Sequence, residues 1–302
     1  MSAETSTTPE EGAGPDSPRS RRSRLDRARP RILTSTSVGL TMVGLTVLIA
    51  LLSPWLTPYS ATATDADIAL MGPGSSHWLG TDQYGRDVLT RTLEGGRYAL
   101  LVSFLSTTIA VVLGTLIGAV AAYAEGWLDE VISRIMDAIL SVPAVLAMLL
   151  IVTVFGQGLW VIVVAVSVVY VPAVARVVRG AARPVAHSGY VTAARARGER
   201  GLPIILREIL PNVRDTVLVE FAMRASWVIL LVSTLSFLGF GADPPTPDWG
   251  LMVDENRTAL TVAPLGTVAP IVSLAVLVVG VNLAADGLAK RMGVDREARA
   301  AS

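Results

Sequence analysis

The chain has 302 residues, of which 52% are hydrophobic and 17% charged, and its formal net charge at pH 7 is zero. This composition is too apolar for an ordinary soluble domain, so it predicts a membrane protein. The absence of cysteine excludes disulfides, thiolate nucleophiles and Cys-ligated zinc or iron–sulfur sites.

Residues 1–31 are rich in Ser, Thr, Pro and Glu, contain almost nothing apolar to bury, and predict a disordered tail. The tail ends in a basic block formed by Arg19, Arg21, Arg22, Arg24, Arg27, Arg29 and Arg31. One interpretation is the n-region of a signal peptide, with a weak cleavage-like site at 61–63. The apolar run 38–56 is longer than a typical signal-peptide core, so we favour a cytoplasmic tail followed by an uncleaved first span.

Six apolar segments are long enough to cross a bilayer, each reaching about 20 residues. They lie at about 38–56, 99–124, 128–155, 159–178, 216–239 and 265–289. Six spans place both termini on the same side of the membrane. The predicted fold is therefore an all-α integral membrane domain over 32–292, with a C-terminal tail over 293–302.

Arginine is concentrated between the fourth and fifth spans. The residues there are Arg176, Arg179, Arg183, Arg195, Arg197, Arg200, Arg207 and Arg214. Four more basic residues follow the sixth span: Lys290, Arg291, Arg296 and Arg299. Because cytoplasmic loops are enriched in basic residues, both termini and the 180–214 loop are predicted to be cytoplasmic. The 58–98 and 240–263 segments are then external, and their Gly and Pro clusters predict ordered turns rather than strands.

The stretch 190–211 predicts a cytoplasmic helix-turn-helix. Residues 191–197 suit a helix, Gly198 and Gly201 supply a permissive backbone for a turn, and a second helix over 204–210 is expected to end at Pro211. Helices this short are marginal alone in water, so the unit must pack on the membrane helices or on another protein.

The chain carries no nucleotide site that the sequence reveals. Lys290 lies between Ala289 and Arg291, so the Gly-Lys-Ser/Thr end of a P-loop is absent, and any ATP and Mg²⁺ must be bound by another subunit. The two histidines, His77 and His187, are isolated, and each is expected to be a surface or hydrogen-bonding residue rather than a metal ligand. No catalytic constellation, cofactor site or nucleic-acid site is predicted.

Charged residues inside the spans form two candidate pairs, Arg134 with Asp137 and Glu220 with Arg224, whose spacings put opposite charges on one helix face. They are interpreted either as self-neutralising pairs near the helix ends or as lining of a polar conduit or partner contact. Asp286 is expected near the cytoplasmic interface.

Two further patterns concern helix shape. Pro143 and Pro172 fall inside spans three and four and predict bends that could flank a cavity. Gly114 and Gly118 lie four apart in span two and predict close helix packing.

The loop that contains Tyr190, Thr192, Ala193, Ala194 and Gly198, with Ile209, Leu210 and Pro211, resembles the E-A-A, x3, G, x10, I-x-P loop of bacterial ABC importer permeases. In that family the loop is the coupling helix, which docks into a groove of a cytoplasmic ATPase subunit. The resemblance thus implies a type I permease fold, with alternating access driven by ATP that partner subunits bind.

Two external stretches narrow the resemblance to the dipeptide, oligopeptide and nickel branch. The first is H-W-L-G-T-D-Q-Y-G-R-D-V-L over 77–89, which contains Gly80, Thr81, Asp82, Gly85, Arg86 and Asp87. The second is L-S-F-L-G-F-G over 235–241 with P-P-T-P-D-W-G over 244–250, which contains Pro244, Pro245, Trp249 and Gly250. The match covers roughly 33–292 and is closest to the second of two paired permeases, the DppC or OppC type.

This resemblance implies three kinds of partner protein and a membrane location. A homologous second permease would complete a heterodimeric pore, one or two ATP-binding subunits would dock in the cytoplasm, and an extracytoplasmic solute-binding protein would deliver the cargo across a bacterial plasma (inner) membrane. Peptides are the expected cargo, and nickel or another small solute is the second candidate.

The sequence departs from the family in the coupling loop and in the fifth span. Thr192 stands where the family usually has Glu, and Val232 stands where a glutamate often precedes L-S-F-L-G. The alternatives are a secondary transporter or channel, which would need related polar sites in two halves, and a non-transporting membrane scaffold, which would not explain the external motifs.

Overall fold

The computed structural model describes residues 18–300, with side chains over 35–290 and at Met292. The protein is almost entirely helical, and within the described residues the only β-type pairing is one isolated bridge between Thr81 and Asp87. The prediction of turns rather than strands in the segments 58–98 and 240–263, which are predicted to be external, is confirmed. Most of the predicted disordered tail, residues 1–17, lies outside the described residues, but residues 18–31 are helical, so the prediction is wrong for them.

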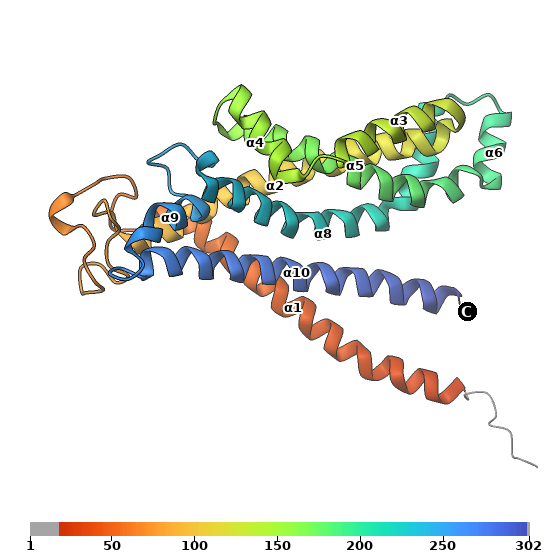
Figure 1. Ribbon diagram of the computed structural model, residues 1–302. Coiled ribbons are helices and arrows are strands. Elements are labelled where there is room, and N and C mark those ends of the chain that lie inside the picture. Colours follow the sequence, from red (N-terminus) through yellow and green to blue (C-terminus); the bar gives the residue numbers. More distant parts are fainter. Residues whose placement is uncertain (1–17, 301–302) are drawn as a thin grey trace, which may run out of the picture.

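Five helical segments are long and apolar enough to span a bilayer on their own (Figure 1). Their helices are α1 (Pro18–Leu56), α2 (Val88–Ala124), α5 (Leu159–Ala186), α8 (Leu210–Leu235) and α10 (Leu265–Ala300). The apolar part of α1 is Ser35–Leu56, and α8 is the middle of a longer helical run, Gly201–Phe240, whose backbone leaves the helical region at Gly239 near its end. The sixth predicted span is a bent pair, α3 (Gly126–Leu140) and α4 (Ala144–Phe155), whose axes differ by 85°.

The bend between α3 and α4 lies where Pro143 predicts it. Ser141 ends α3, and Pro143 precedes the first residue of α4. A proline has no N–H to donate to the preceding turn and its ring crowds that turn, so one continuous helix is unfavourable there. Pro172 acts differently, because α5 continues through it as one helix.

The bundle core is built around α2 and α5. An added Cβ on Gly114 would lie 2.7 Å from Val174 Cβ, and one on Gly118 would lie 2.5 Å from Ala175 O. Only glycine fits at these positions, so the predicted close packing is confirmed. α1 packs on α10 in a similar way, since a Cβ on Gly39 would lie 2.5 Å from Ala284 N.

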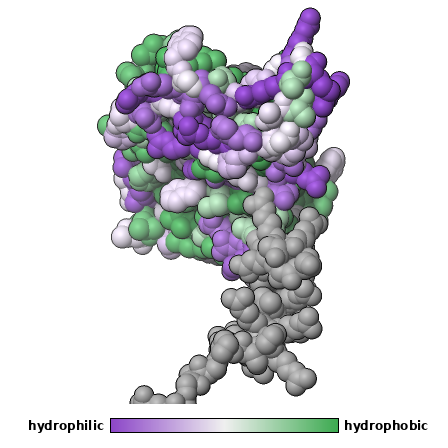
Figure 2. All heavy atoms as spheres, turned by 90° about the vertical axis from the view of Figure 1, so that its right-hand side faces the viewer, coloured by the Kyte–Doolittle hydropathy of each residue, from purple (hydrophilic) through white to green (hydrophobic). Residues whose placement is uncertain are grey.

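The two ends of the bundle differ in structure (Figure 1). One end, here the α6 end, carries α6 (Gly189–Ala196) and the turn that follows it. The other, the α9 end, carries α9 (Trp249–Asn256) and the long segment between α1 and α2. Viewed end-on, the α6 end is covered largely by hydrophilic side chains (Figure 2).

Candidate functional site

The helix α6 has two unlike faces. Its inward side chains, Val191 and Ala194, are buried in a cluster with residues of α2, α5 and the 204–213 stretch. Its outward side chains, Tyr190, Thr192 and Ala193, are exposed. Burial of the inner face fixes α6 on the bundle, and the outer face has no cover among the described residues.

The turn after α6 is a Schellman motif centred on Gly198. The Gly198 N–H donates to Arg195 O at 3.0 Å, and the Glu199 N–H donates to Ala194 O at 3.2 Å. Gly198 has a φ of +76°, in the left-handed region that glycine adopts most easily. Nothing lies within 4 Å of a Cβ added there, so the backbone conformation, and not a lack of space, is what calls for glycine.

The helix after the turn does not end at Pro211, so that prediction is wrong. It begins with α7 (Gly201–Ile204), widens into a π-helical stretch (Ile205–Ile209) and continues as α8. Pro211 lies in the first turn of α8, where the preceding π-helical turn accommodates a residue without an N–H. The second predicted short helix is thus the start of a membrane helix, with Ile209 buried and Leu210 half-buried.

Contacts with the end of α2 hold α6 and its turn in place. The Arg195 guanidinium lies 4.3 Å above the Tyr123 ring, and its Nη2 donates to Tyr123 O at 3.0 Å. The Arg195 and His187 side chains both approach Glu125 Oε1, at 3.7 and 3.5 Å. An added Cβ on Gly201 would lie 2.8 Å from the Tyr123 ring. These contacts involve three helices, so α6 is a fixed part of the bundle.

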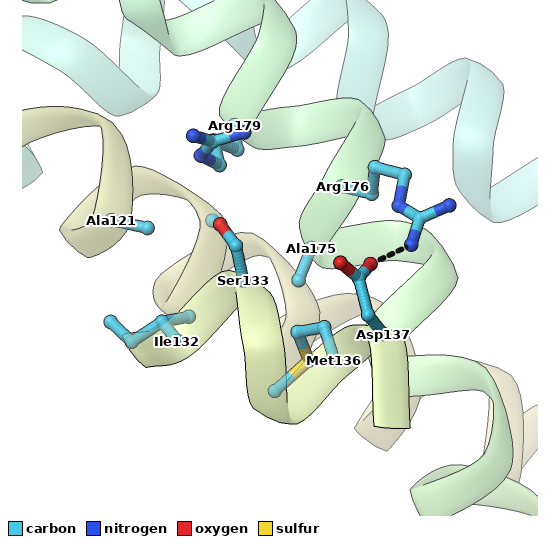
Figure 3. Close-up of a pocket in the computed structure, with 9 residues that line it drawn as sticks. Ala121, Ile132, Ser133, Met136, Asp137, Ala175, Arg176 and Arg179 are labelled. Atoms are coloured by element: carbon cyan, nitrogen blue, oxygen red, sulfur yellow. Dashed lines mark hydrogen bonds and ion pairs between the residues drawn. The ribbon is translucent and has the colours of Figure 1, made fainter. Parts of the chain in front are cut away.

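A cavity of about 160 Å³ lies between α2, α3 and α5. Its lining includes Ser133, Asp137, Arg176 and Arg179, and Figure 3 shows Asp137 of α3 pointing to Arg176 of α5. Arg179 binds Asp129 through two nitrogens, with Nη2 to Oδ2 at 2.6 Å. These ion pairs attach α3 to α5 beside the α6 end.

Of the two predicted intramembrane ion pairs, the structure contains one and not the other. Asp137 pairs with Arg176 and not with Arg134, which instead lies 3.6 Å from Glu130 on an exposed face, so the Arg134–Asp137 pair is wrong. The reason is tertiary, because α3 packs on α5 and brings a better-placed guanidinium to Asp137. The pair within α8 is confirmed: Arg224 Nε donates to Glu220 Oε2 at 2.9 Å.

Asp286 is exposed on α10. Within the part of the chain that the structure describes, no three His, Asp or Glu side chains are grouped so as to hold a metal.

At the α9 end, the external motif residues form a buried ion-pair cluster. Asp82 accepts from Arg86 Nε at 2.7 Å and from the Tyr84 and Arg86 backbone amides at 2.9 Å each. Glu255 of α9 accepts from Arg86 at 2.7 Å and from Arg91 at 3.0 Å. Arg91 is completely buried and also donates to two backbone carbonyls, those of Ala61 and Pro245. The cluster therefore ties the segment before α2 to the segment around α9.

Two glycines of the first external motif are required by close backbone approaches. Gly80 and Gly85 have φ values of +75° and +72°, and a Cβ would lie 2.3 Å from Met71 O and 1.7 Å from Asp65 O, respectively. Thr81 is buried here and donates to Ile68 O.

Asp87 connects this loop to the start of α2. It caps α2 by accepting from Thr90 N at 2.7 Å, and its other oxygen lies 2.9 Å from His77 Nδ1. His77 is thus the hydrogen-bonding residue that the sequence predicts.

The second external motif packs α9 against α2 and α8. Trp249 is buried, and its indole N–H donates to Thr92 O at 2.7 Å. A Cβ on Gly250 would lie 2.4 Å from Ser233 O. Pro244 and Pro245 are joined by a cis peptide bond in the loop before α9.

Asp248 begins α9 by accepting from Leu251 N at 3.1 Å. Burial in this apolar setting raises the pKa of Asp248 to about 6, against the lowering effect of hydrogen bonds from Leu251, Ser236 and Gly250.

Comparison with known proteins identifies the family. Residues 90–294 match the family described as "Binding-protein-dependent transport system inner membrane component". The chain belongs to this family. It is an ABC transporter permease subunit, a non-catalytic, multi-pass inner-membrane protein with the type I permease fold.

Two relatives illustrate the range of the match. The permease is 38% identical over 245 residues to the glutathione transport system permease protein GsiD of Pectobacterium atrosepticum, with 81% of each chain covered. It is 37% identical over 251 residues to the dipeptide transport system permease protein DppC of Alkalihalophilus pseudofirmus, with 83% of each covered. Among solved structures, an inward-facing MetNI methionine ABC transporter matches in fold, with a TM-score of 0.55, 20% identity, and 68% of this chain and 95% of that chain covered.

Sequence reasoning missed several residues that organise this permease. Arg91 and Glu255 form the centre of the cluster at the α9 end but are 164 positions apart, so no local spacing connects them. Asp129 and Arg179 are likewise on different helices. The available signal was Arg91 itself, an arginine at the start of an apolar helix, which is costly unless a partner neutralises it.

Proposed function

We propose that this permease forms half of the pore of an ATP-driven importer for peptides or a related small solute, and that α6 is its coupling helix. The observation that carries the proposal is the two-faced packing of α6: Val191 and Ala194 are held in the bundle, while Tyr190, Thr192 and Ala193 face outward. A partner can bind the accessible face of such a helix, and the buried face then transmits the partner's movement to the bundle.

The turn and the following helix supply a mechanical path. Gly198 reverses the chain directly into the helical run that begins at Gly201, which continues through α8 toward the opposite end of the bundle and leaves the helical region only at Gly239. A displacement of α6 would therefore be transmitted to α8. Such a displacement can bias inward-open and outward-open states only if the partner interacts differently with the two.

The composition of the docking face distinguishes this permease from the usual pattern. Thr192 carries no charge, and its hydroxyl donates to Ser188 O at 3.1 Å within the same helix. The face is therefore small and neutral at its centre and basic at its edge, with Arg195 held by Tyr123 and Arg197 by Glu199. The partner's groove is therefore expected to be apolar where it contacts the centre of this face and to carry acidic groups at its rim.

The assembly that we propose contains a second, homologous permease, one or two cytoplasmic ATP-binding subunits that hold ATP and Mg²⁺, and an extracytoplasmic solute-binding protein. The arginine distribution supports a cytoplasmic α6 end with both termini on that side. Glutathione and dipeptides in the relatives' names support a peptide cargo, and nickel remains the second candidate.

A matched pair of glycine variants tests the coupling role. Gly198→Ala and Gly180→Ala both add a methyl group in open, exposed space, but only Gly198 has a positive φ. Left-handed backbone costs a non-glycine residue about 1–2 kcal/mol. We expect Gly198→Ala to reduce peptide uptake per ATP hydrolysed in proteoliposomes that contain the whole importer, with Gly180→Ala unchanged.

Equal coupling ratios in both variants would contradict the role of the turn. Uptake that continues without ATP would favour a secondary transporter or channel, and purification of the chain without any ATPase would favour a scaffold.

A further inference from the structure

The Glu220–Arg224 pair lies in the membrane-spanning part of α8. In the apolar span predicted over 216–239, Arg224 lies 8 residues after the first position and 15 before the last, which is about 12 and 23 Å along the helix axis. The hydrocarbon core is about 30 Å thick. Tyr170, which lies within electrostatic reach of Arg224, is 11 residues into α5, or about 17 Å. Both helices thus place the Arg224 guanidinium more than about 10 Å inside the membrane.

A guanidinium at this depth is energetically costly and therefore points to a function. Arginine near the bilayer centre is expensive, and such residues normally face the bundle interior or a water-filled path. Glu220 is buried, whereas 23% of the Arg224 side chain is accessible. The positive member of the pair is therefore the one that a ligand can reach.

The hydrogen bonding of Arg224 is incomplete. Among the described residues only its Nε is used, by Glu220 Oε2 at 2.9 Å, and no partner is found for Nη1 or Nη2. Arg179 differs, because two of its nitrogens bind the two oxygens of Asp129. Ser226 and Asn282, close to Arg224 on α8 and α10, also satisfy each other at 2.8 Å. Arg224 therefore has open donors among the described residues, unlike Arg179 near the α6 end and unlike the Ser226–Asn282 pair.

The open edge of Arg224 defines the chemistry of its ligand. Arginine has donors only, and its Nη1 and Nη2 form a planar fork that matches the two oxygens of a carboxylate. Glu220 fixes the other edge and neutralises most of the charge, so an anion would bind weakly enough to leave again, as a transport path requires. A lipid phosphate at the membrane surface is too far away to bind this fork, and a carboxylate carried by the cargo has the matching geometry.

We propose that Arg224, oriented by Glu220, is a transient binding point for the carboxylate of the cargo on the translocation path. This inference rests on the proposed peptide import and adds a specificity-determining residue to it. Because Arg224 lies on the helix that begins at the coupling turn, movement of α6 would also move this binding point.

The test compares two cargoes in the intact importer. Uptake of a labelled peptide with a free C-terminal carboxylate and of its C-terminal amide is measured in proteoliposomes that contain both permeases, the ATPases, the binding protein and ATP. The carboxylate-to-amide ratio is then compared between the native importer and Arg224→Gln. Since the binding protein is the same in both, its own preference cancels in this comparison.

We expect Arg224→Gln to reduce the ratio about tenfold, the effect of a charge-assisted hydrogen bond of about 1.4 kcal/mol. Arg224→Lys keeps the charge without the fork and should give an intermediate ratio. Arg134→Gln, on an exposed face of α3, is the control and should leave the ratio unchanged. If Arg224→Gln is not inserted stably because Glu220 is left unpaired, the double variant Glu220→Gln/Arg224→Gln removes both charges and should show the same tenfold loss.

Three outcomes would overturn the inference. Native uptake with a ratio that Arg224→Gln and the double variant leave unchanged would overturn it alone, with peptide import intact. Loss of assembly with the second permease in both variants would assign the fork to a partner carboxylate. No ATP-dependent uptake of either peptide by the native importer would overturn the proposed cargo, and this inference with it.

Discussion

The two ends of this permease treat charge in opposite ways. At the α9 end, Arg86 and Arg91 are buried and bound to Asp82 and Glu255, and the loops around them are closed by short backbone contacts. At the α6 end, the side chains of the turn are mostly exposed, and the ion pair between Arg197 and Glu199 lies in solvent. The first arrangement fixes parts of the chain that are far apart in sequence, and the second leaves charged side chains accessible.

This difference in burial predicts different consequences for substitutions at the two ends. Breaking a buried ion pair leaves an unpaired charge in a low-dielectric setting, whereas an exposed pair contributes little. Substitutions at the α9 end should therefore affect folding, and substitutions on the outer face of α6 should affect partner binding.

Replacing Arg91 should cause the largest loss of stability. Arg91→Met leaves Glu255 with one fewer donor and removes the hydrogen bonds to Ala61 O and Pro245 O. We expect the free energy of unfolding in detergent to fall by about 3–5 kcal/mol. Arg257→Met, which removes a largely exposed partner of Asp254 at 3.2 Å, is the control and should change it by less than about 1 kcal/mol. Similar losses in both variants would contradict the distinction between buried and exposed pairs.

The stability of the α9 end should depend on pH through Asp248. Its folded pKa is about 6, above the ordinary value of 3.8, so the folded state binds the proton more tightly than the unfolded state. The stabilisation is fully present below about pH 4 and is lost as the pH rises through 6, with a total of roughly 2–3 kcal/mol.

Asp248→Asn keeps a side-chain oxygen for the Leu251 N–H but cannot ionise. Unfolding measured from pH 4 to 7 should show a smaller decline in this variant than in the native protein. Parallel curves would show that Asp248 does not titrate in this range.

The two faces of α6 should separate in a pair of leucine substitutions. Ala194 is 1% exposed, so Ala194→Leu overfills the cluster and should cost about 1–3 kcal/mol in stability. Ala193 is exposed, so Ala193→Leu should stay within about 0.5 kcal/mol of the native protein while weakening capture of the ATPase. Weakened capture by neither variant would contradict docking on this face.

The smallest effect is expected at the exposed pair of the turn. Arg197→Ala removes hydrogen bonds to Glu199 of 2.6 and 3.0 Å, but the Arg197 side chain is 61% exposed. The cost in stability should be roughly 0–1 kcal/mol and should shrink further in high salt. A thermal shift larger than that of Ala194→Leu would reverse the ranking.

The spans could be predicted because long apolar runs and arginine-rich loops are local signals. Gly198 was found for the same reason, since a turn after a short helix favours glycine. The helix starts were less accurate: α2 begins at Val88 and not near 99, because the charge of Arg91 in its first turn is neutralised by Glu255 of a distant segment.

Tertiary packing decided what the sequence could not reveal. Asp137 has Arg134 three residues away but pairs with Arg176 of another helix, and Arg91 pairs with Glu255 across 164 positions. Pro211 is a strong local stop signal, yet it lies inside a long helix, because the π-helical turn before it absorbs the missing donor. Spacing along one element predicts which groups can meet, and the packing of elements decides which do.

The central claim, docking of an ATPase on the outer face of α6, can be tested directly because the chain contains no cysteine. Thr192→Cys places a single exposed thiol on that face, and Ser75→Cys places one at the α9 end. The rate of maleimide labelling of this subunit is measured in detergent, in the assembled importer and after removal of the ATPase. If the ATPase docks on this face, it should protect Thr192→Cys at least about tenfold from labelling and should not protect Ser75→Cys. Equal labelling of Thr192→Cys with and without the ATPase would contradict it.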